Sequence, residues 1–154
     1  MLFRSSRPIS VDREYPSAPL VGVAAAVFNH QGQVLLVKRG RQPAKGSWGL
    51  PGGLLDLGER LEDGVRREVR EETAIEIDIG GLVAAIEPLE FDDDDRIRYH
   101  YVVLDYWARH ISGIPHAQDD AEEAAWVNLA AMDGLRMSDE TRRVIRLAHQ
   151  QWQR

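Results

Sequence analysis

The sequence contains no cysteine. This absence excludes a disulfide-stapled scaffold, thiolate catalysis, and zinc or iron–sulfur sites that cysteine would hold. Long apolar runs are also missing, because no segment approaches the roughly 18 consecutive apolar residues that a membrane span requires. The first 19 residues lack the continuous apolar stretch of a secretory signal. We therefore expect a cytoplasmic protein with no membrane partner.

Basic residues are scarce relative to acidic ones, 19 Lys and Arg against 25 Asp and Glu, and the net charge is −6. A protein that coats nucleic acid needs a basic face to neutralise phosphates, so we expect no nucleic-acid partner. The length of 154 residues suits one domain. We assign residues 1–19 to an N-terminal arm and residues 20–154 to a single domain.

Hydrophobic periodicity predicts strands on both sides of an early helix, followed by a second helix. The expected strands cover residues 21–28, 33–39, 75–79, 82–91, 96–109 and 124–127. The expected helices cover residues 57–73 and, after the N-cap Ser138, continue to about Trp152, with one helical turn at 129–132. The four aspartates of 92–95 lack the spacing of a calcium loop, which predicts a solvated turn. This order is typical of an α+β protein, an α/β/α sandwich around a mixed central sheet.

The early helix carries glutamates close to its apolar stripe. Leu61, Val65 and Val69 form that stripe, at spacings of four residues. On a helical projection Glu72 falls between Leu61 and Val65, and Glu68 lies at the edge of the stripe. At least two carboxylates are therefore predicted to point toward the sheet.

A buried carboxylate is costly unless it is paired or bound to a cation. Glu71 lies on the same flank as Glu68, so three neighbouring glutamates would repel one another without a cation. Carboxylate oxygens favour Mg²⁺. The alternative is a charged surface helix with intrahelical salt bridges, which is the usual meaning of such a charge run. Arg67 is placed to hold Glu71, four residues further on.

The residues before this helix support the interpretation that its glutamates form a cation site. The segment Pro51-Gly52-Gly53 permits a sharp turn and a close backbone approach. Glu59 places another carboxylate at the start of the helix, where negative charge suits the helix dipole.

The whole segment resembles the Nudix box. Gly53 is followed after five residues by Glu59, and after seven more by Arg67-Glu68-Val69-Arg70-Glu71-Glu72-Thr73-Ala74-Ile75. Every position agrees with the family pattern except Ala74, which stands where the family has the glycine that ends the helix. Alanine disfavours a left-handed cap by about 1 kcal/mol, but no metal ligand is lost. The likeness extends from about residue 21 through the strand at residue 127.

The resemblance implies a Nudix fold and hydrolysis of nucleoside diphosphates linked to another group, assisted by Mg²⁺ or Mn²⁺. Carried over by position, the implied metal ligands are the Gly53 carbonyl, Glu59, Glu68, Glu71 and Glu72. The implied catalytic residues are Glu71, Glu72 and Arg67. The general base stays open between a glutamate of the box, with Glu71 slightly preferred, and the acids of a later loop, which are Asp119, Asp120, Glu122 and Glu123.

The partner implied is a small nucleotide. We assign substrate binding to Arg39 at a strand end, Tyr99 as a base-stacking side chain, and Glu123. The tyrosine strand is open to another interpretation, as core or as a homodimer face. Pro88 and the strand around Tyr99 are similar to ADP-ribose pyrophosphatases. The first function hypothesis is therefore an ADP-ribose pyrophosphatase. The second is a MutT-like (deoxy)nucleoside triphosphate pyrophosphohydrolase, and the third is a non-catalytic ligand sensor with the Nudix fold.

Overall fold

The computed structural model describes residues 11–154, so residues 1–10 of the predicted arm lie outside the described part. Within it, the strands and helices predicted from periodicity are present in the expected order. The elements are β1 (Leu20–Phe28), β2 (Val34–Arg39), β3 (Trp48–Gly49), β4 (Gly52–Leu54), α1 (Leu61–Thr73), β5 (Glu76–Ile86), β6 (Leu89–Phe91), β7 (Ile97–Ser112), β8 (Ala121–Val127), the 3₁₀ helix η1 (Leu129–Gly134) and α2 (Asp139–Trp152).

The strands form one mixed sheet. Its main path runs β3-β2-β1-β7-β5, while β4 pairs with β1, β6 with β7 and β8 with β2. The β1–β7 pair is parallel and the other pairs are antiparallel. The mixed sheet expected from the sequence is confirmed, and β1 lies at its centre because it pairs with β2, β4 and β7.

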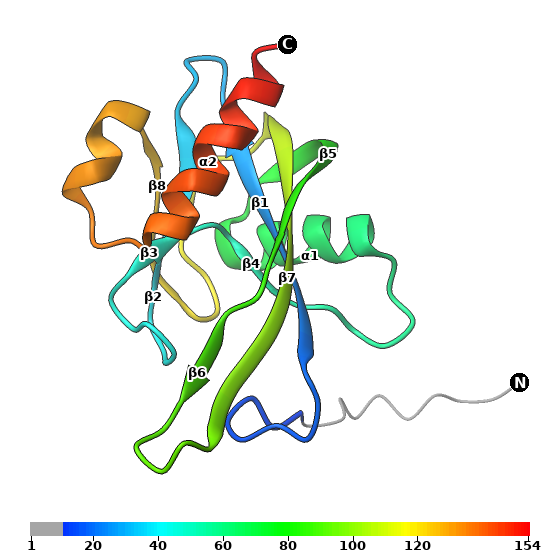
Figure 1. The fold of residues 1–154 in the computed structure, drawn as a ribbon. Coiled ribbons are helices and arrows are strands. Elements are labelled where there is room, and N and C mark those ends of the chain that lie inside the picture. Colours follow the sequence, from blue (N-terminus) through cyan, green and yellow to red (C-terminus); the bar gives the residue numbers. More distant parts are fainter. Residues whose placement is uncertain (1–10) are drawn as a thin grey trace, which may run out of the picture.

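Helices α1 and α2 cover different faces of this sheet (Figure 1). Successive side chains of a strand point to opposite faces, so β1 contributes to two cores. One core joins β1 to α1 through Val23, Ala25, Val27, Val65 and Val69. The other joins β1 to α2 through Ala26, Phe28, Ile145 and Ala148. The near-continuous apolar run of β1 follows from burial on both faces, and the α/β/α sandwich is confirmed.

Several predicted boundaries were wrong. Helix α1 begins at Leu61 rather than at residue 57, because Gly58 adopts a φ of 83° and the chain is still turning there. Strand β5 runs without a break from Glu76 to Ile86, and register shifts accommodate its two central glycines. Strand β8 begins at Ala121, three residues before the predicted start.

The C-terminal end of α1 is held by a left-handed residue and a following loop. Ala74 has φ 63° and ψ 19°, and its N–H donates to the Arg70 carbonyl at 2.9 Å. The N–H groups of His116 and Gln118 donate to the carbonyls of Thr73 and Glu72, at 2.9 and 3.0 Å. These bonds satisfy carbonyls that a helix end leaves unpaired. They also fix the loop that precedes β8 against the end of α1.

Helix α2 begins at the predicted N-cap, since the Ser138 hydroxyl accepts the Thr141 N–H at 3.1 Å. In residues 11–154 neither helix combines the length and the apolar character that a membrane crossing demands.

Candidate active site

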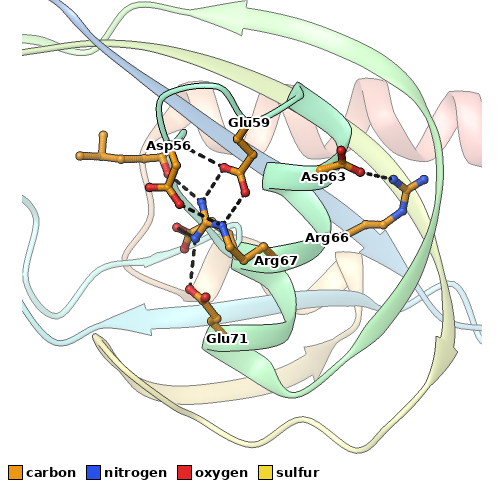
Figure 2. Close-up of polar contacts among 8 residues, drawn as sticks. Asp56, Glu59, Asp63, Arg66, Arg67 and Glu71 are labelled. Atoms are coloured by element: carbon orange, nitrogen blue, oxygen red, sulfur yellow. Dashed lines mark hydrogen bonds and ion pairs between the residues drawn. The ribbon is translucent and has the colours of Figure 1, made fainter. Parts of the chain in front are cut away.

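Arg67 is the centre of a polar network on the inner side of α1 (Figure 2). Its Nε and Nη2 donate to the two carboxylate oxygens of Glu59, at 2.7 and 2.9 Å. Its Nη1 donates to Glu68 at 2.7 Å and to Glu71 at 3.2 Å. Nη2 also donates to the Leu54 carbonyl at 3.0 Å. The predicted contact between Arg67 and Glu71 is present, and one guanidinium links three hydrogen-bonded carboxylates to β4, with Asp56 a further 3.5 Å contact of its Nε.

Glu59 acts within this network as a partner of Arg67. Hydrogen bonds from Arg67 hold the pKa of Glu59 below its usual value, against the opposing effect of burial. Glu59 also accepts the Asp56 N–H at 3.1 Å, which fixes the loop before α1. The structure does not place Glu59 on the wall of the acidic cavity described next. This placement favours a positioning function for Glu59.

An acidic cavity of about 410 Å³ lies beside α1. Carboxylates from α1 and from the loop before β8 share it with three arginines and the two glycines of β4. The lining residues are Arg13, Arg39, Arg41, Gly52, Gly53, Glu68, Glu71, Glu72, Asp119 and Asp120. The cavity thus brings together residues from five separate parts of the chain.

Glu72 is the most strongly perturbed carboxyl of this cavity. Burial raises its pKa to about 7, and the charges of Glu68 and Asp120 act in the same direction. The Gly52 N–H, which donates to Glu72 at 2.9 Å, and the charge of Arg39 oppose this rise. The helical projection predicted that Glu72 points toward the sheet, and its bond to β4 confirms this orientation.

Glu68 lies against the backbone of Gly53. A Cβ built on Gly53 would overlap the Glu68 carboxylate, so a side chain at that position is excluded unless Glu68 moves. Burial raises the pKa of Glu68, while its hydrogen bond from Arg67 opposes the shift. The close backbone approach expected at Gly53 is therefore present, and it serves to seat a carboxylate.

The donor set of this cavity fits a hard divalent cation. Its walls offer five carboxylates, and such oxygen ligands suit Mg²⁺ or Mn²⁺. The raised pKa values of Glu68 and Glu72 show carboxylates whose burial is poorly compensated, which a cation would relieve. Within residues 11–154 no three acidic or histidine side chains form a preassembled metal cage. Glu68 and Glu72 would hold the ion, together with Glu71, which Arg67 positions beside Glu68.

A second, apolar cavity of about 320 Å³ adjoins the acidic one. The two share Arg13, Arg39, Gly52 and Gly53 as lining residues, so they meet at β4. The apolar cavity lies between β1, β7, strand β3 with the loop before it, and the start of α2. Its volume falls in the range of small-molecule sites.

The structure brings some predicted site residues together and leaves others apart. Arg39 lines both cavities, as a substrate-binding residue should. Tyr99 lines neither: it is buried beside Glu14, and its neighbour Tyr101 lines the apolar cavity instead. Glu123 also lines neither, since it lies exposed on β8 and pairs with Lys38 at 3.8 Å. Tyr99 and Tyr101 share one face of β7, and their rings stack with centroids 6.4 Å apart, so Tyr99 lies further along the strand, beyond the cavity wall.

Sequence reasoning missed several lining residues. Arg13 and Arg41 lack a motif, and only the folded chain brings them to Glu68 and Glu72. Asp105, which lies within the strand predicted over residues 96–109, was not identified as a candidate either. A charged side chain inside a strand otherwise rich in Val, Leu, Tyr and Trp was the signal that could have identified it.

Comparison with known proteins identifies the family to which this chain belongs. The NUDIX domain matches residues 18–148. The chain belongs to the NUDIX family. Its NUDIX domain resembles that of NrtR from Shewanella oneidensis, solved with ADP ribose, with a TM-score of 0.73 and 28% identity over 88% of this chain and 90% of that one.

Two curated relatives of this NUDIX chain carry different names. The "ADP-ribose pyrophosphatase" of Methanocaldococcus jannaschii is 31% identical over 114 residues, which are 74% of this chain and 65% of that protein. The "Nucleoside triphosphatase NudI" of an Enterobacter species is 27% identical over 135 residues, 78% of this chain and 90% of that protein. The chain thus spans just under two thirds of the first relative's length.

Proposed function

We propose that this NUDIX protein hydrolyses the pyrophosphate bond of a nucleoside diphosphate linked to a second group, with ADP-ribose as its substrate. The products are AMP and ribose 5-phosphate. The observation that carries the proposal is the junction of an apolar cavity with an acidic, arginine-bearing one. A nucleotide has the same two parts, a flat ring system and a charged phosphate chain.

Arginines at the junction explain how an acidic protein attracts an anionic substrate. Arg13 and Arg39 line both cavities, and Arg41 lines the acidic one. A guanidinium binds phosphate oxygens through two parallel hydrogen bonds. The net charge of −6 is thus offset locally, where the diphosphate would lie.

The reaction requires water to attack one phosphorus while the bond from that phosphorus to the bridging oxygen breaks. Bound Mg²⁺ or Mn²⁺ would polarise the phosphates and acidify water, and Glu68 and Glu72 would hold the ion. The proton of the attacking water passes to a carboxylate, for which Glu71, Asp119 and Asp120 are placed in the acidic cavity. Arg67 fixes Glu68 and Glu71 relative to each other.

Two observations support ADP-ribose as the substrate. They are the names of relatives and the space that the acidic cavity offers beyond the diphosphate. An ADP-ribose pyrophosphatase is among the relatives, and the NrtR domain was solved with ADP ribose. The second ribose of ADP-ribose needs space beyond the diphosphate, and the acidic cavity of about 410 Å³ adjoins the loop before β8.

A nucleoside triphosphate is the second candidate substrate. The same two cavities accept a base and a phosphate chain, and one relative is named a nucleoside triphosphatase. Such an enzyme releases a nucleoside monophosphate and pyrophosphate.

A substrate panel tests the proposal. Purified protein with Mg²⁺ or Mn²⁺ is given ADP-ribose, nucleotide sugars, nucleoside triphosphates and dinucleoside polyphosphates, and the products are separated by anion-exchange chromatography. We expect AMP and ribose 5-phosphate, with kcat/KM highest for ADP-ribose. A preference of more than about tenfold for any triphosphate, equivalent to about 1.4 kcal/mol in the transition state, would select the second candidate. No turnover of any compound would contradict catalysis.

A further inference from the structure

Strand β7 presents a buried carboxyl to the apolar cavity. Tyr101, Val103 and Asp105 alternate along β7, so they share one face of the sheet, and all three line this cavity. Asp105 is only 3% exposed, and its Oδ2 has no hydrogen-bond partner. The acidic cavity does not include Asp105 among its lining residues, so the two cavities carry separate carboxyl groups.

The surroundings of Asp105 favour its neutral form. In the register of the sheet it lies between Ala24 of β1 and Ala84 of β5, neither of which is charged. Burial raises its pKa to about 7, with the charge of Glu140 acting in the same direction and that of Arg143 opposing it; both belong to α2. Asp105 therefore keeps a proton up to neutral pH, although the same group would ionise in water near pH 4.

A buried polar atom without a partner lowers stability by about 1–3 kcal/mol. The neighbouring strands offer no side-chain partner for this atom, because the residues opposite Asp105 on β1 and β5 are both alanines. A ligand in the cavity would supply the missing partner. Small-molecule sites of this kind are mostly apolar, with a few placed polar groups that set orientation and specificity.

We propose that Asp105 is the specificity-determining residue of the apolar cavity, where its carboxyl group hydrogen-bonds the edge of the substrate's nucleobase. This inference rests on the proposed function. A neutral carboxyl group donates through its O–H and accepts through its C=O. Adenine offers the matching pair side by side, an acceptor at N1 and a donor at its 6-amino group. Asp105 thus selects adenine nucleotides through the base, whereas the carboxylates of α1 act at the diphosphate.

Two substitutions separate this recognition function from a structural one. Asp105→Leu removes both hydrogen bonds. Asp105→Asn keeps one donor and one acceptor without a titratable proton. Asp63→Asn is the matched control, because it makes the same exchange at an exposed carboxyl of α1 that lines neither cavity. Thermal unfolding first establishes that each variant is folded.

The substrates for the test are ADP-ribose and its analogue in which the purine lacks the 6-amino group. We expect the wild type and Asp63→Asn to prefer ADP-ribose by about tenfold or more in kcat/KM at pH 6.5. Asp105→Leu should abolish this preference, mainly through a higher KM for ADP-ribose with kcat nearly unchanged. Asp105→Asn should retain it. The wild-type preference should decline above about pH 7, as Asp105 ionises, while that of Asp105→Asn should not. A preference in Asp105→Leu equal to that of the wild type would overturn the inference.

A binding measurement distinguishes this inference from the proposed function. Calorimetry without divalent cation compares AMP with the monophosphate whose purine lacks the 6-amino group. Weaker AMP binding by Asp105→Leu, but not by Asp105→Asn, supports base recognition even if the wild type hydrolyses no substrate, in which case only the proposed function fails. Equal AMP affinity in wild type and Asp105→Leu, or no AMP binding at all, overturns the inference. If either of these binding results is found and the protein still hydrolyses ADP-ribose, only the inference about Asp105 fails and the proposed function is supported.

Discussion

Arg67 and Glu59 form a two-pronged ion pair, in which Nε and Nη2 of the guanidinium meet the two carboxylate oxygens at 2.7 and 2.9 Å. Eight residues separate them, so the pair joins the middle of α1 to the loop that precedes it. Because Glu59 holds one side of the guanidinium, Nη1 is aimed at Glu68 and Glu71. The pair therefore sets the position of two carboxylates of the acidic cavity.

Replacing Arg67 by lysine should damage both stability and activity. An ammonium cannot reproduce the planar fork, and the partly buried Glu59 and Glu68 would lose their hydrogen bonds. We expect a loss of about 2 kcal/mol in the free energy of unfolding, measured by urea denaturation, because partners of a charged group are left unpaired. We also expect kcat to fall by at least about tenfold.

Arg66 provides the matched control. It lies next to Arg67 on α1, is more exposed, and contacts Glu62 and Asp63 only at 3.5 Å (Figure 2). Arg66→Lys should change stability by less than about 0.5 kcal/mol. Equal effects of the two substitutions would contradict the structural importance given to Arg67.

Glu72→Gln should remove activity yet raise stability at neutral pH in the absence of divalent cations. In the folded protein the pKa of Glu72 is about 7, against 4.5 for an ordinary glutamate. Below pH 4.5 both states are protonated and Glu72 contributes nothing to pH dependence. Between these values the unfolded chain ionises while the folded protein keeps its proton, so the free energy of unfolding falls as pH rises. The loss reaches at most about 3 kcal/mol above pH 7.

The measurement is urea denaturation of wild type and Glu72→Gln with a chelator, at pH 4 and pH 8. We expect the variant to gain stability over the wild type at pH 8 and to match it at pH 4. Glu62→Gln, on the exposed face of α1, should have the same free energy of unfolding as the wild type at both pH values. In the activity assay Glu72→Gln should lose at least about 10²-fold in kcat. Full turnover by this variant with Mg²⁺ would refute the assignment of the site.

Ala74→Gly should stabilise the protein. Ala74 occupies a left-handed conformation, with φ 63°, that glycine adopts without steric cost. We expect a gain of about 1 kcal/mol in the free energy of unfolding. Ala130→Gly, in the 3₁₀ helix, serves as a control and should destabilise by roughly 0.5–1 kcal/mol. A loss of stability in Ala74→Gly would show that the cap carries no strain.

Arg13→Gln should weaken substrate binding more than it slows the chemical step. Arg13 lines both cavities at their junction and lies close enough to lower the pKa of Glu68. We expect KM for ADP-ribose to rise by about tenfold, or about 1.4 kcal/mol, with kcat within about threefold of wild type. Arg146→Gln, which removes an exposed arginine of α2 paired with Asp133, should leave both constants unchanged. A change confined to kcat would contradict a substrate-binding function for Arg13.

Local pattern was enough to predict the helix that carries the acids. The spacing of Leu61, Val65 and Val69 determined which side of α1 is buried, and hence that Glu68 and Glu72 point inward. The order of strands and the sandwich followed in the same way, because alternation and helical periodicity are properties of neighbouring residues. The resemblance places the end of the helix at residue 74, and Ala74 adopts the left-handed conformation there although alanine disfavours it.

Tertiary structure alone decided what surrounds those acids. Arg13 precedes β1, Arg41 follows β2, and Asp120 precedes β8, yet the sheet brings all three to one cavity. No local period encodes such contacts, because they depend on which strands pair and in what register. Strand pairing also decided that Tyr101 and Asp105, but not Tyr99, lie in the wall of the apolar cavity. The sequence by itself thus determined the fold and the acidic helix, whereas strand pairing decided which residues complete the site.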